Sequence, residues 1–327
     1  MAVPEAADPV ADFTPHLQMV AQEFANGYVV PFLGAGANLC GRTETNWAPG
    51  KALPSGAELA KHLAASCAYP YDDVDNLVRV SQYHATTKGA GQLYSELRTV
   101  FDQDYPPTPL HSLLAALPKV LAERGRLRRY PLIVTTNYDD ALESAFQAAE
   151  EPFDLVSYMA TGSNRGRFVH TGPDGDAQLI DRPNKYKDLS LDDRTVILKI
   201  HGAVDRHERR RDSFVITEDH YIDYLTRTEL ASLVPVTLVE VLSETHFLFL
   251  GYSMRDWNLR VILHRIWQEQ EDLPWEHWAV QLVVDDLDRK FWGRRGIEIL
   301  ELDLGDYVRG LDAEVRKLEP APAPARP

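Results

Sequence analysis

The sequence predicts an α/β fold in which helices cover both faces of a parallel sheet. Short and uniformly apolar segments, among them 28–33, 132–135 and 246–250, alternate with helical patterns. Strands that are apolar throughout are typical of a sheet that is buried on both faces. Glycine or polar residues follow these segments directly, as expected where parallel strands end at one edge of a sheet. The predicted arrangement is Rossmann-like.

The N-terminal part contains a helical block between the first two strands. Helices are expected, in chain order, over 11–27, 55–67, 73–88 and 91–103 and from residue 110. Thr14 is expected to cap the first helix before Pro15, and an S-x-x-E capping box from Ser55 to Glu58 opens the second. Because the block 55–117 is too long for a simple crossover, it predicts a helical insertion subdomain.

The C-terminal part returns to alternating strands and helices. After the strand 132–135 we expect a helix over 140–149, a strand over 195–200, helices over 218–226 and 228–243, a strand over 246–250, a helix over 256–270 and a strand over 277–284. The polar segment 155–194 is expected to be an irregular insertion. One domain is therefore predicted over 1–317, followed by a disordered Pro/Ala tail over 318–327.

Composition limits the class of protein. Hydrophobic residues make up 44% and charged residues 25% of the chain, as in ordinary globular proteins. No apolar run is long enough to cross a bilayer, and no secretory leader is recognised, so no membrane association is expected. Two cysteines, Cys40 and Cys67, cannot form a disulfide framework or a four-thiolate zinc site. The expected location is the reducing cytoplasm, and no metal is expected.

The charge of the chain argues against nucleic-acid binding. The formal net charge is −15 at pH 7, which repels a phosphate backbone unless a basic patch offsets it locally. Two arginine clusters, within 124–129 and 206–211, are candidates for such a patch, but neither contains aromatic residues on which bases could stack. We therefore expect no direct contact with nucleic acid.

Four predicted strands end in polar or glycine motifs. These are Gly34-Ala35-Gly36-Ala37-Asn38, Thr135-Thr136-Asn137-Tyr138-Asp139, Lys199-Ile200-His201-Gly202 and Gly251-Tyr252-Ser253. Because ligands of an open parallel sheet bind at the carboxyl ends of its strands, the four motifs are expected to converge on one crevice. Gly34 and Gly36 would let backbone amides approach a pyrophosphate without an intervening Cβ atom.

The first motif has a second interpretation, as the phosphate-binding loop of an ATPase. The segment 36–43 differs by one residue from the G-x-x-x-x-G-K-[ST] pattern, with Arg42 at the lysine position. The segment 282–285 could then be the acidic strand that holds magnesium. Arginine is not a neutral replacement for that lysine, and the loop would have to begin inside the turn at Gly34 to Gly36. The ATPase interpretation is therefore the less favoured one.

Taken together, the four motifs resemble the sirtuin superfamily over roughly residues 28–260. Sirtuins carry a GAG loop, a T-x-N-x-D motif, an H-G motif and a G-x-S motif in this order. The chain has no cysteines after His201-Gly202, where sirtuin deacetylases carry four zinc ligands. The Tyr138-Asp139 pair and the triplet 251–253 are more similar to the bacterial sirtuin-like NAD⁺ hydrolases, which are typically NAD⁺-depleting effectors of anti-phage defence. The resemblance implies NAD⁺ as the substrate, without a zinc module.

Residue chemistry and the resemblance together suggest roles for the motif residues. His201 is the expected general base, Asn137 would orient the ribose or the water, and Asp139 would either hold the nicotinamide carboxamide or cap the helix 140–149. Asp256 is expected to cap the helix that follows it. The expected contacts with the dinucleotide are Gly34, Ala35 and Gly36 at the phosphates, Gly251 and Ser253 at the adenosine, and also Thr136 and Asn38, the last at a position where the family commonly has serine.

Two classes of function stay open at this point. The first is an NAD⁺ glycohydrolase, and the second is a sensor or scaffold that holds NAD⁺ or ADP-ribose without turnover; a protein deacylase is less favoured. The presence of both Asn137 and His201 favours the enzyme, because a binding protein needs no general base.

An unregulated NAD⁺ hydrolase would kill its host, as in abortive infection, so its activity is expected to be restrained. We expect a homo-oligomer whose interfaces use the helices within 55–117 or 218–243. Because no sensor domain is recognisable in the sequence, a separate partner such as a HerA-type ATPase or an Argonaute-like protein is also expected.

Overall fold

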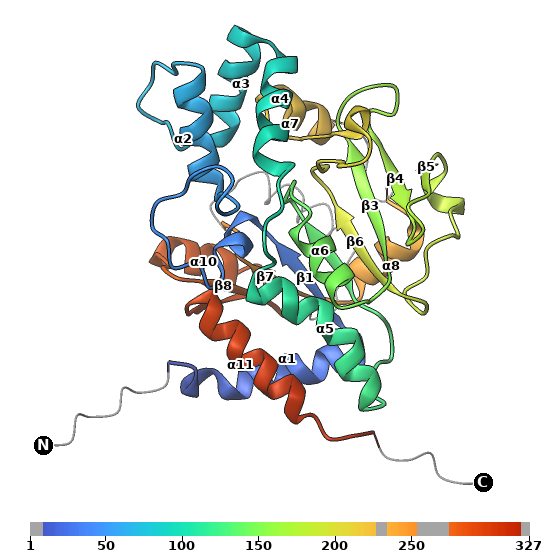
Figure 1. Cartoon of the computed structure of the whole chain (residues 1–327). Helices are drawn as coiled ribbons and strands as arrows, with labels where there is room; N and C mark the ends of the chain where they lie inside the picture. Colours follow the sequence, from blue (N-terminus) through green and yellow to red (C-terminus); the bar gives the residue numbers. More distant parts are fainter. Residues whose placement is uncertain (1–8, 227–233, 254–274, 322–327) are drawn as a thin grey trace, which may run out of the picture.

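The computed structural model describes residues 9–226, 234–253 and 275–321 (Figure 1). The strands are β1 (Val29–Leu33), β2 (Leu132–Thr135), β3 (Phe153–Met159), β4 (Arg167–Thr171), β5 (Ala177–Ile180), β6 (Thr195–Lys199), β7 (His246–Leu250), β8 (His277–Gln281) and β9 (Ile297–Glu301). The α-helices are α1 (Thr14–Asn26), α2 (Gly56–Ser66), α3 (Leu77–Lys88), α4 (Ala90–Phe101), α5 (Pro109–Glu123), α6 (Ala141–Ala148), α7 (Glu218–Thr226), α8 (Val236–Ser243), α10 (Asp286–Gly293) and α11 (Leu304–Lys317). Short 3₁₀ helices are η1 (Ala11–Phe13), η2 (Ala35–Leu39), η3 (Pro183–Lys185) and η4 (Arg209–Arg211).

A single mixed sheet organises the described residues. Its strand order is β5-β4-β3-β6-β2-β1-β7-β8-β9. The neighbouring strands β3, β6, β2, β1, β7, β8 and β9 all pair in parallel. At the β3 edge, β4 pairs antiparallel with β3, and β5 pairs antiparallel with β4. The predicted α/β fold with a largely parallel, Rossmann-like sheet is confirmed.

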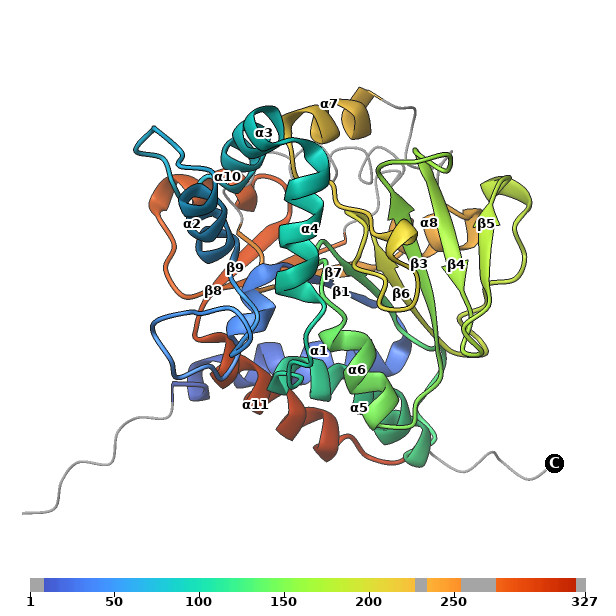
Figure 2. The same cartoon turned by 45° about the horizontal axis from the view of Figure 1, so that its top comes forward.

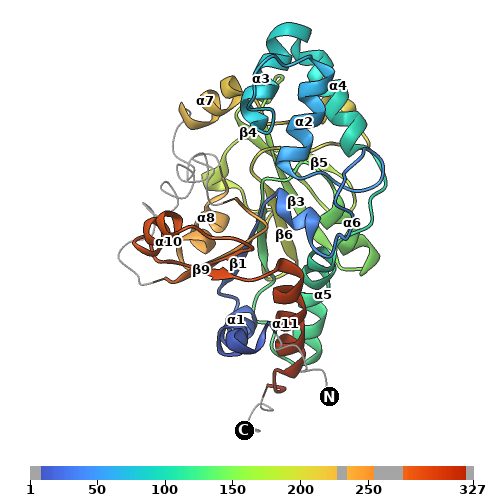
Figure 3. The same cartoon turned by 90° about the vertical axis from the view of Figure 1, so that its left-hand side faces the viewer.

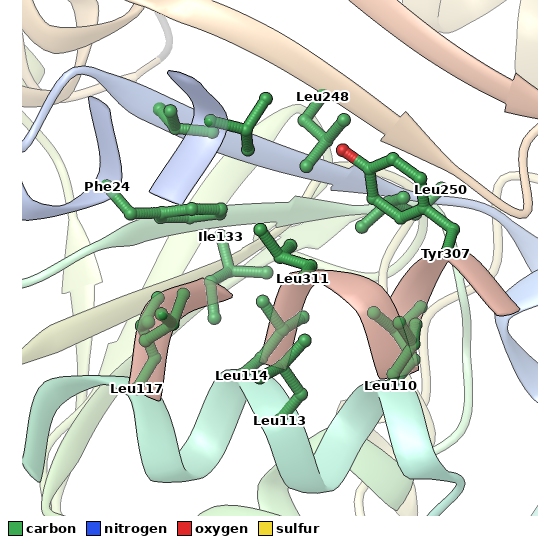
Figure 4. Close-up of a cluster of buried hydrophobic side chains, with 14 of the residues drawn as sticks. Phe24, Leu110, Leu113, Leu114, Leu117, Ile133, Leu248, Leu250, Tyr307 and Leu311 are labelled. Atoms are coloured by element: carbon green, nitrogen blue, oxygen red, sulfur yellow. The ribbon is translucent and has the colours of Figure 1, made fainter. Parts of the chain in front are cut away.

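Helices cover both faces of this sheet, as Figure 3 shows from the side. Along β1, Val30 and Phe32 join one apolar core together with side chains of α8 and α10. Val29 and Leu33 point to the other face and join a second core with α1, α5, α6 and α11. In the second core the leucines of α5 meet Leu311 of α11 (Figure 4). Side chains of β1 point alternately to the two faces, and each face is covered by an apolar core. Every position of β1 is therefore buried, and none is polar.

A third apolar core belongs to the helical block. Helices α2, α3 and α4 bury Leu59, Val80 and Leu97 among themselves, and Figure 2 shows these helices together with α7 on one side of the molecule. The capping box of α2 is confirmed, because the Ser55 hydroxyl accepts the Glu58 amide and the Glu58 carboxylate accepts the Ser55 amide. Helix α5 leaves this block and packs on the sheet. Tyr138 and Phe214, which lie outside the block, also belong to this core, and α4 is the last helix of the predicted block 55–117 that contributes to it.

Two local expectations at the ends of the chain are corrected. Helix α1 continues directly from η1, so Thr14 is its first residue, Phe13 takes the cap position and no side-chain cap bond forms. Part of the expected disordered tail is held by α5, because the Arg124 side chain donates to the Leu318 carbonyl at 2.6 Å and the Ala321 amide donates to the Arg124 carbonyl at 2.9 Å. Residues 322–327 lie outside the described residues.

The segment 155–194 is not an irregular insertion. Strands β3, β4 and β5 occupy much of it and extend the sheet at one edge. In β3 and β4, buried positions largely alternate with half-buried or exposed ones, and polar residues such as Asp154, Ser157 and His170 interrupt the apolar residues, so no continuous apolar run marks the strands.

Other expectations fall on residues that are not described. The helix 256–270 with its cap Asp256 lies outside the described residues, as does the beginning of the helix expected over 228–243, of which α8 is the described part. Within the part of the chain that is described, no helix is both long and apolar enough to cross a membrane.

Candidate active site

The four strand-end motifs line one cavity of about 1120 Å³. All residues expected at the site contribute to its wall: Gly34, Ala35, Gly36, Asn38, Thr136, Asn137, Asp139, His201, Gly251 and Ser253. They meet because β6, β2, β1 and β7 are consecutive in the sheet and run in the same direction. The volume slightly exceeds the range of about 300–1,000 Å³ that is usual for ligand pockets, so a dinucleotide can be accommodated.

The glycines of the first and fourth motifs serve close packing between two loops. The Gly36 amide donates to the Gly251 carbonyl at 2.7 Å. Gly251 has a φ of +65°, and a Cβ atom there would collide with the Ala37 amide. Cβ atoms at Gly34 and Gly36 would likewise meet the backbone of residues 251–252. The Gly36 amide is therefore occupied within the protein, and contact of this loop with a pyrophosphate stays a prediction.

Asn137 presents an amide oxygen that lacks a partner. Its Nδ2 donates to the Gly34 carbonyl at 3.1 Å, and its backbone amide donates to the Thr135 hydroxyl at 3.0 Å. Because a carbonyl can only accept, this bond fixes which way the side-chain amide is turned. The Oδ1 atom is buried without a hydrogen-bond partner on a side chain that is only 8% exposed and lines the cavity.

Asn38 is held in the same way by Asp139. Its Nδ2 donates to Asp139 Oδ2 at 3.0 Å, and its Oδ1 is buried without a partner. The second carboxylate oxygen, Asp139 Oδ1, accepts the Ala141 amide at 3.2 Å, so Asp139 satisfies the first turn of α6. Asp140 occupies the formal cap position but makes no side-chain cap bond. The capping role of Asp139 is thus observed, and its contact with a carboxamide remains a prediction.

His201 lies at the end of β6 in a deeply buried position. Its side chain is 2% exposed, the rings of Tyr221 and Tyr224 contact it edge-on at 5.4 and 5.8 Å between centroids, and its Nε2 has no hydrogen-bond partner. Burial lowers the pKa of His201 to about 3, so the imidazole is neutral throughout the physiological range. Gly202 follows with a φ of +82°, and a Cβ atom there would collide with the Ser213 carbonyl.

Two further residues that were expected to contact the dinucleotide, Thr136 and Ser253, also line the cavity. Thr136 is half-buried, and its amide donates to the Leu33 carbonyl at 3.1 Å, which ties the turn after β2 to the end of β1. Ser253 is exposed and lines the cavity next to Gly251.

Three residues near the cavity were not expected from the sequence. Lys199 is buried beneath it and donates to the Asp139 carbonyl and to the Glu143 carboxylate. Gln281 lines it and donates to the Tyr252 carbonyl at 2.7 Å. The sequence signal for Lys199 was a single charge in the otherwise apolar strand β6. The signal for Gln281 was a polar residue at the end of β8. Tyr221, on α7, carried no such signal.

The competing interpretations find little support in the geometry. No helix begins directly after the segment 36–43, as a phosphate-binding loop requires, because the next helix, α2, begins only at Gly56. Arg42 instead pairs with Glu58 at 2.6 Å. Asp285 caps α10 by accepting the Asp288 amide at 2.7 Å. Among the described residues, no group of three or more His, Cys, Asp or Glu side chains is arranged to hold a metal ion.

The arginine clusters are occupied in contacts within the protein. Arg124 and Arg126 donate to backbone carbonyls of residues 316–319. Arg206 pairs with the carboxylates of Asp104 and Asp140. Carboxylates therefore oppose the charge of Arg206, whereas the bonds of Arg124 and Arg126 to carbonyls leave their charges in place.

Comparison with known proteins agrees with this site. The family model described as "SIR2-like domain" matches residues 131–300, just over half of the chain, and the chain belongs to this family. The predicted membership in the sirtuin superfamily is therefore confirmed.

Two curated relatives come from bacteria. "NAD(+) hydrolase ThsA" of Acinetobacter baumannii (strain 532279) is 27% identical over 235 residues, which cover 71% of this chain and 39% of that protein. "Defense-associated sirtuin 2" of Bacillus subtilis is 24% identical over 199 residues, which cover 61% of this chain and 16% of that protein. The chain thus spans less than half the length of either relative. Both names agree with the branch of the superfamily that the motifs predict.

Proposed function

We propose that this chain hydrolyses NAD⁺ to nicotinamide and ADP-ribose. In this reaction the bond between the ribose C1′ and the nicotinamide nitrogen breaks, and its electron pair neutralises the pyridinium ring. A water oxygen bonds to C1′ and releases a proton. Because nicotinamide leaves as a neutral molecule, the protein need not protonate it. The protein has to hold the ribose and the carboxamide and to orient the attacking water.

The observation that carries the proposal is a set of three buried polar atoms that have no hydrogen-bond partner in the part of the chain that the structure describes. They are Asn38 Oδ1, Asn137 Oδ1 and His201 Nε2, on three side chains that line the same cavity. Leaving a buried acceptor unpaired costs about 1–3 kcal/mol, so three of them at one place favour a ligand that supplies donors. The two asparagine oxygens can only accept, and His201 Nε2 accepts when the ring proton is on Nδ1. Ribose hydroxyls and water are donors of this kind.

The order of strands suggests how NAD⁺ lies in the cavity. His201 and Asn137 follow β6 and β2, the Gly34–Gly36 loop follows β1, and Gly251 follows β7. In the proposed arrangement the nicotinamide ribose lies at His201 and Asn137, the pyrophosphate at the glycine loop and the adenosine towards Gly251 and Ser253. Thr136 and Asn38 contact the dinucleotide between these groups.

Each catalytic group has a limited task in this proposal. Asn137 orients the ribose or the water, and His201 accepts the proton of the attacking water as its oxygen bonds to C1′. The low pKa of His201 makes it a weak base, so it accepts the proton only as the water oxygen bonds to C1′ and that proton becomes strongly acidic. Asp139 contacts the carboxamide only with electron pairs that Asn38 and Ala141 leave unused.

The test is incubation of the purified chain with NAD⁺ while nicotinamide and ADP-ribose are separated by chromatography. Equimolar release of both products is expected. Cyclic ADP-ribose in place of ADP-ribose would show that a nucleophile of the adenosine half of the substrate, rather than water, attacks C1′. Binding of NAD⁺ with no release of nicotinamide under any condition would contradict hydrolysis.

A second candidate function is a subunit that binds NAD⁺ or ADP-ribose without turnover. The low pKa of His201 favours it, because a neutral imidazole that resists protonation can hold a hydroxyl without removing its proton. Calorimetric binding of NAD⁺ together with an unchanged NAD⁺ concentration after prolonged incubation would identify this function.

We also propose that the enzyme acts in the cytoplasm as an NAD⁺-depleting effector of anti-phage defence, and that its activity is restrained until a signal arrives. The names of the two relatives support this context. The proposed restraint is a homo-oligomeric assembly, together with a separate partner such as a HerA-type ATPase or an Argonaute-like protein. A sizing measurement combined with the NAD⁺ assay tests it. A monomer that is fully active alone would contradict the restraint but not the hydrolysis.

A further inference from the structure

A buried cation lies behind the cavity. Lys199, the last residue of β6, is 1% exposed. Its Nζ donates to the backbone carbonyl of Asp139, in the turn after β2, and to Glu143 Oε1 of α6 at 2.6 Å. The ammonium group therefore joins the end of β6 to the segment that carries Asn137 and Asp139.

Stability alone does not account for this ion pair. Burial raises the pKa of Glu143 even though Lys199 lies beside it, and Glu143 Oε2 is buried without a partner. A buried ion pair of this kind is often no more stable than two well-packed apolar side chains of similar volume. The position of the pair under the site calls for another explanation.

The contacts of Lys199 continue towards the cavity. Asp139, whose carbonyl Lys199 holds, accepts Asn38 through its carboxylate at 3.0 Å. Asn38 Oδ1 is buried without a partner among the described residues, on a side chain that lines the cavity. His201 follows Lys199 by two residues. One cation thus sets the relative position of the chain segments that carry all three unpartnered atoms.

We propose that Lys199 is a positioning residue for NAD⁺ cleavage. It holds the turn 137–139 against the end of β6, so that the oxygens of Asn38 and Asn137 keep their distance from His201. This inference rests on the proposed hydrolysis. A displacement of about 1 Å between catalytic groups can cost on the order of 100-fold in rate, so loss of the lysine should act on kcat.

The first experiment separates positioning from folding. Lys199→Met alone leaves Glu143 as an unpaired buried carboxylate and is expected to destabilise the protein. In the double variant Lys199→Met/Glu143→Leu both charges are removed, so the melting temperature should recover at least in part. We expect kcat to stay about 10- to 100-fold below the wild-type value in the double variant, with KM changed by less than about threefold.

A second buried pair provides the matched control. Arg98 and Asp212 form an ion pair at 2.9 Å, and neither side chain lines the cavity. The variant Arg98→Met/Asp212→Leu should retain kcat within about twofold of the wild type, because no contact joins either side chain to Asn38, Asn137 or His201 among the described residues. If Lys199→Met/Glu143→Leu is as active as this control, Lys199 has no positioning role.

A double-mutant cycle tests the connection to Asn38, which Lys199 reaches only through Asp139. Asn38→Ala is made in the wild type and in Lys199→Met/Glu143→Leu, and the affinity for ADP-ribose is measured by calorimetry. The loss caused by Asn38→Ala should be at least about threefold smaller in the second background. Additive losses would overturn the inference. Because this readout needs no turnover, it stays valid even if the wild type releases no nicotinamide, a result that would count against the proposed function alone.

Discussion

Two buried histidines show how a structural polar cluster differs from a binding site. His170, on β4, uses both ring nitrogens: Nε2 contacts Asp154 Oδ1 at 3.0 Å and Nδ1 contacts the Tyr186 hydroxyl at 2.7 Å. Asp154 is also bound by Arg194 at 3.1 Å. His201, on the other side of β3 in the sheet, is even less exposed, yet its Nε2 has no partner.

The difference lies in what each position leaves for a ligand. The Asp154 cluster (Asp154, His170, Tyr186 and Arg194) pairs its histidine internally, so it joins β3, β4 and the segment before β6 and offers little to a substrate. At the strand ends, buried acceptors without a partner among the described residues belong to side chains that line a cavity. Since unpaired buried polar atoms cost stability, their accumulation at one place indicates that binding, rather than folding, determines those residues.

The largest expected effect is on turnover. His201→Ala and Asn137→Ala should each lower kcat by about 10²- to 10⁴-fold, as is usual when a positioned proton acceptor or ligand clamp is lost. Both variants should keep the wild-type circular dichroism spectrum. His170→Ala is the matched control and should keep kcat near the wild-type value. Full NAD⁺ cleavage by a folded His201→Ala protein would remove His201 from the mechanism.

For the free energy of unfolding, replacement of His170 should have a larger effect than replacement of His201. His170→Phe leaves Asp154 and the Tyr186 hydroxyl with fewer partners, and we expect it to lower the free energy of unfolding by about 1–3 kcal/mol. His201→Phe removes an unpaired nitrogen and keeps an aromatic ring against Tyr221, so the free energy of unfolding should be unchanged or higher. Urea denaturation of both variants measures this difference. Equal destabilisation would show that the two histidines are alike.

Acid should weaken the fold partly through His201. Burial lowers the pKa of His201 to about 3, whereas an unfolded histidine titrates near ~6.5. Between these values the unfolded chain binds a proton that the folded chain does not. The contribution is therefore fully present above about pH 6.5 and is lost as the pH falls towards 3, by at most about 1.4 kcal/mol per pH unit. His201→Phe should show a shallower loss of stability between about pH 6.5 and 5, measured by urea midpoints. A slope identical to that of the wild type would contradict the buried, neutral state of His201.

The smallest expected effect is that of chelators. If neither histidine is a metal ligand, EDTA should change neither the melting temperature nor the rate of nicotinamide release, and elemental analysis should find no stoichiometric zinc. Acyl-lysine peptides should not be deacylated. Zinc bound in equimolar amount and lost together with His170 would identify the Asp154 cluster as a metal site.

Much of the framework was predictable because its signals are local. The strands β1, β2, β6 and β7 are apolar runs that end in glycine or polar motifs, and the capping box at Ser55 is contained in four residues. Strands β3 to β5 escaped prediction because polar residues interrupt their apolar residues, some at partly exposed positions and some, such as Asp154 and His170, within a buried polar cluster. The position of α5 was not predicted, because an apolar helix can pack either in the core of the helical block or against the sheet.

The sequence by itself determined the fold class, the family and which residues gather at the strand ends, because all of these depend on short segments and their order. Only the tertiary structure decided how those residues are paired. Asn38 and Asp139 meet across a separation of 101 residues, and Lys199 reaches Asp139 from a third strand. Whether a buried atom has a partner depends on segments that come together only in the folded chain, and local sequence carries no record of that contact.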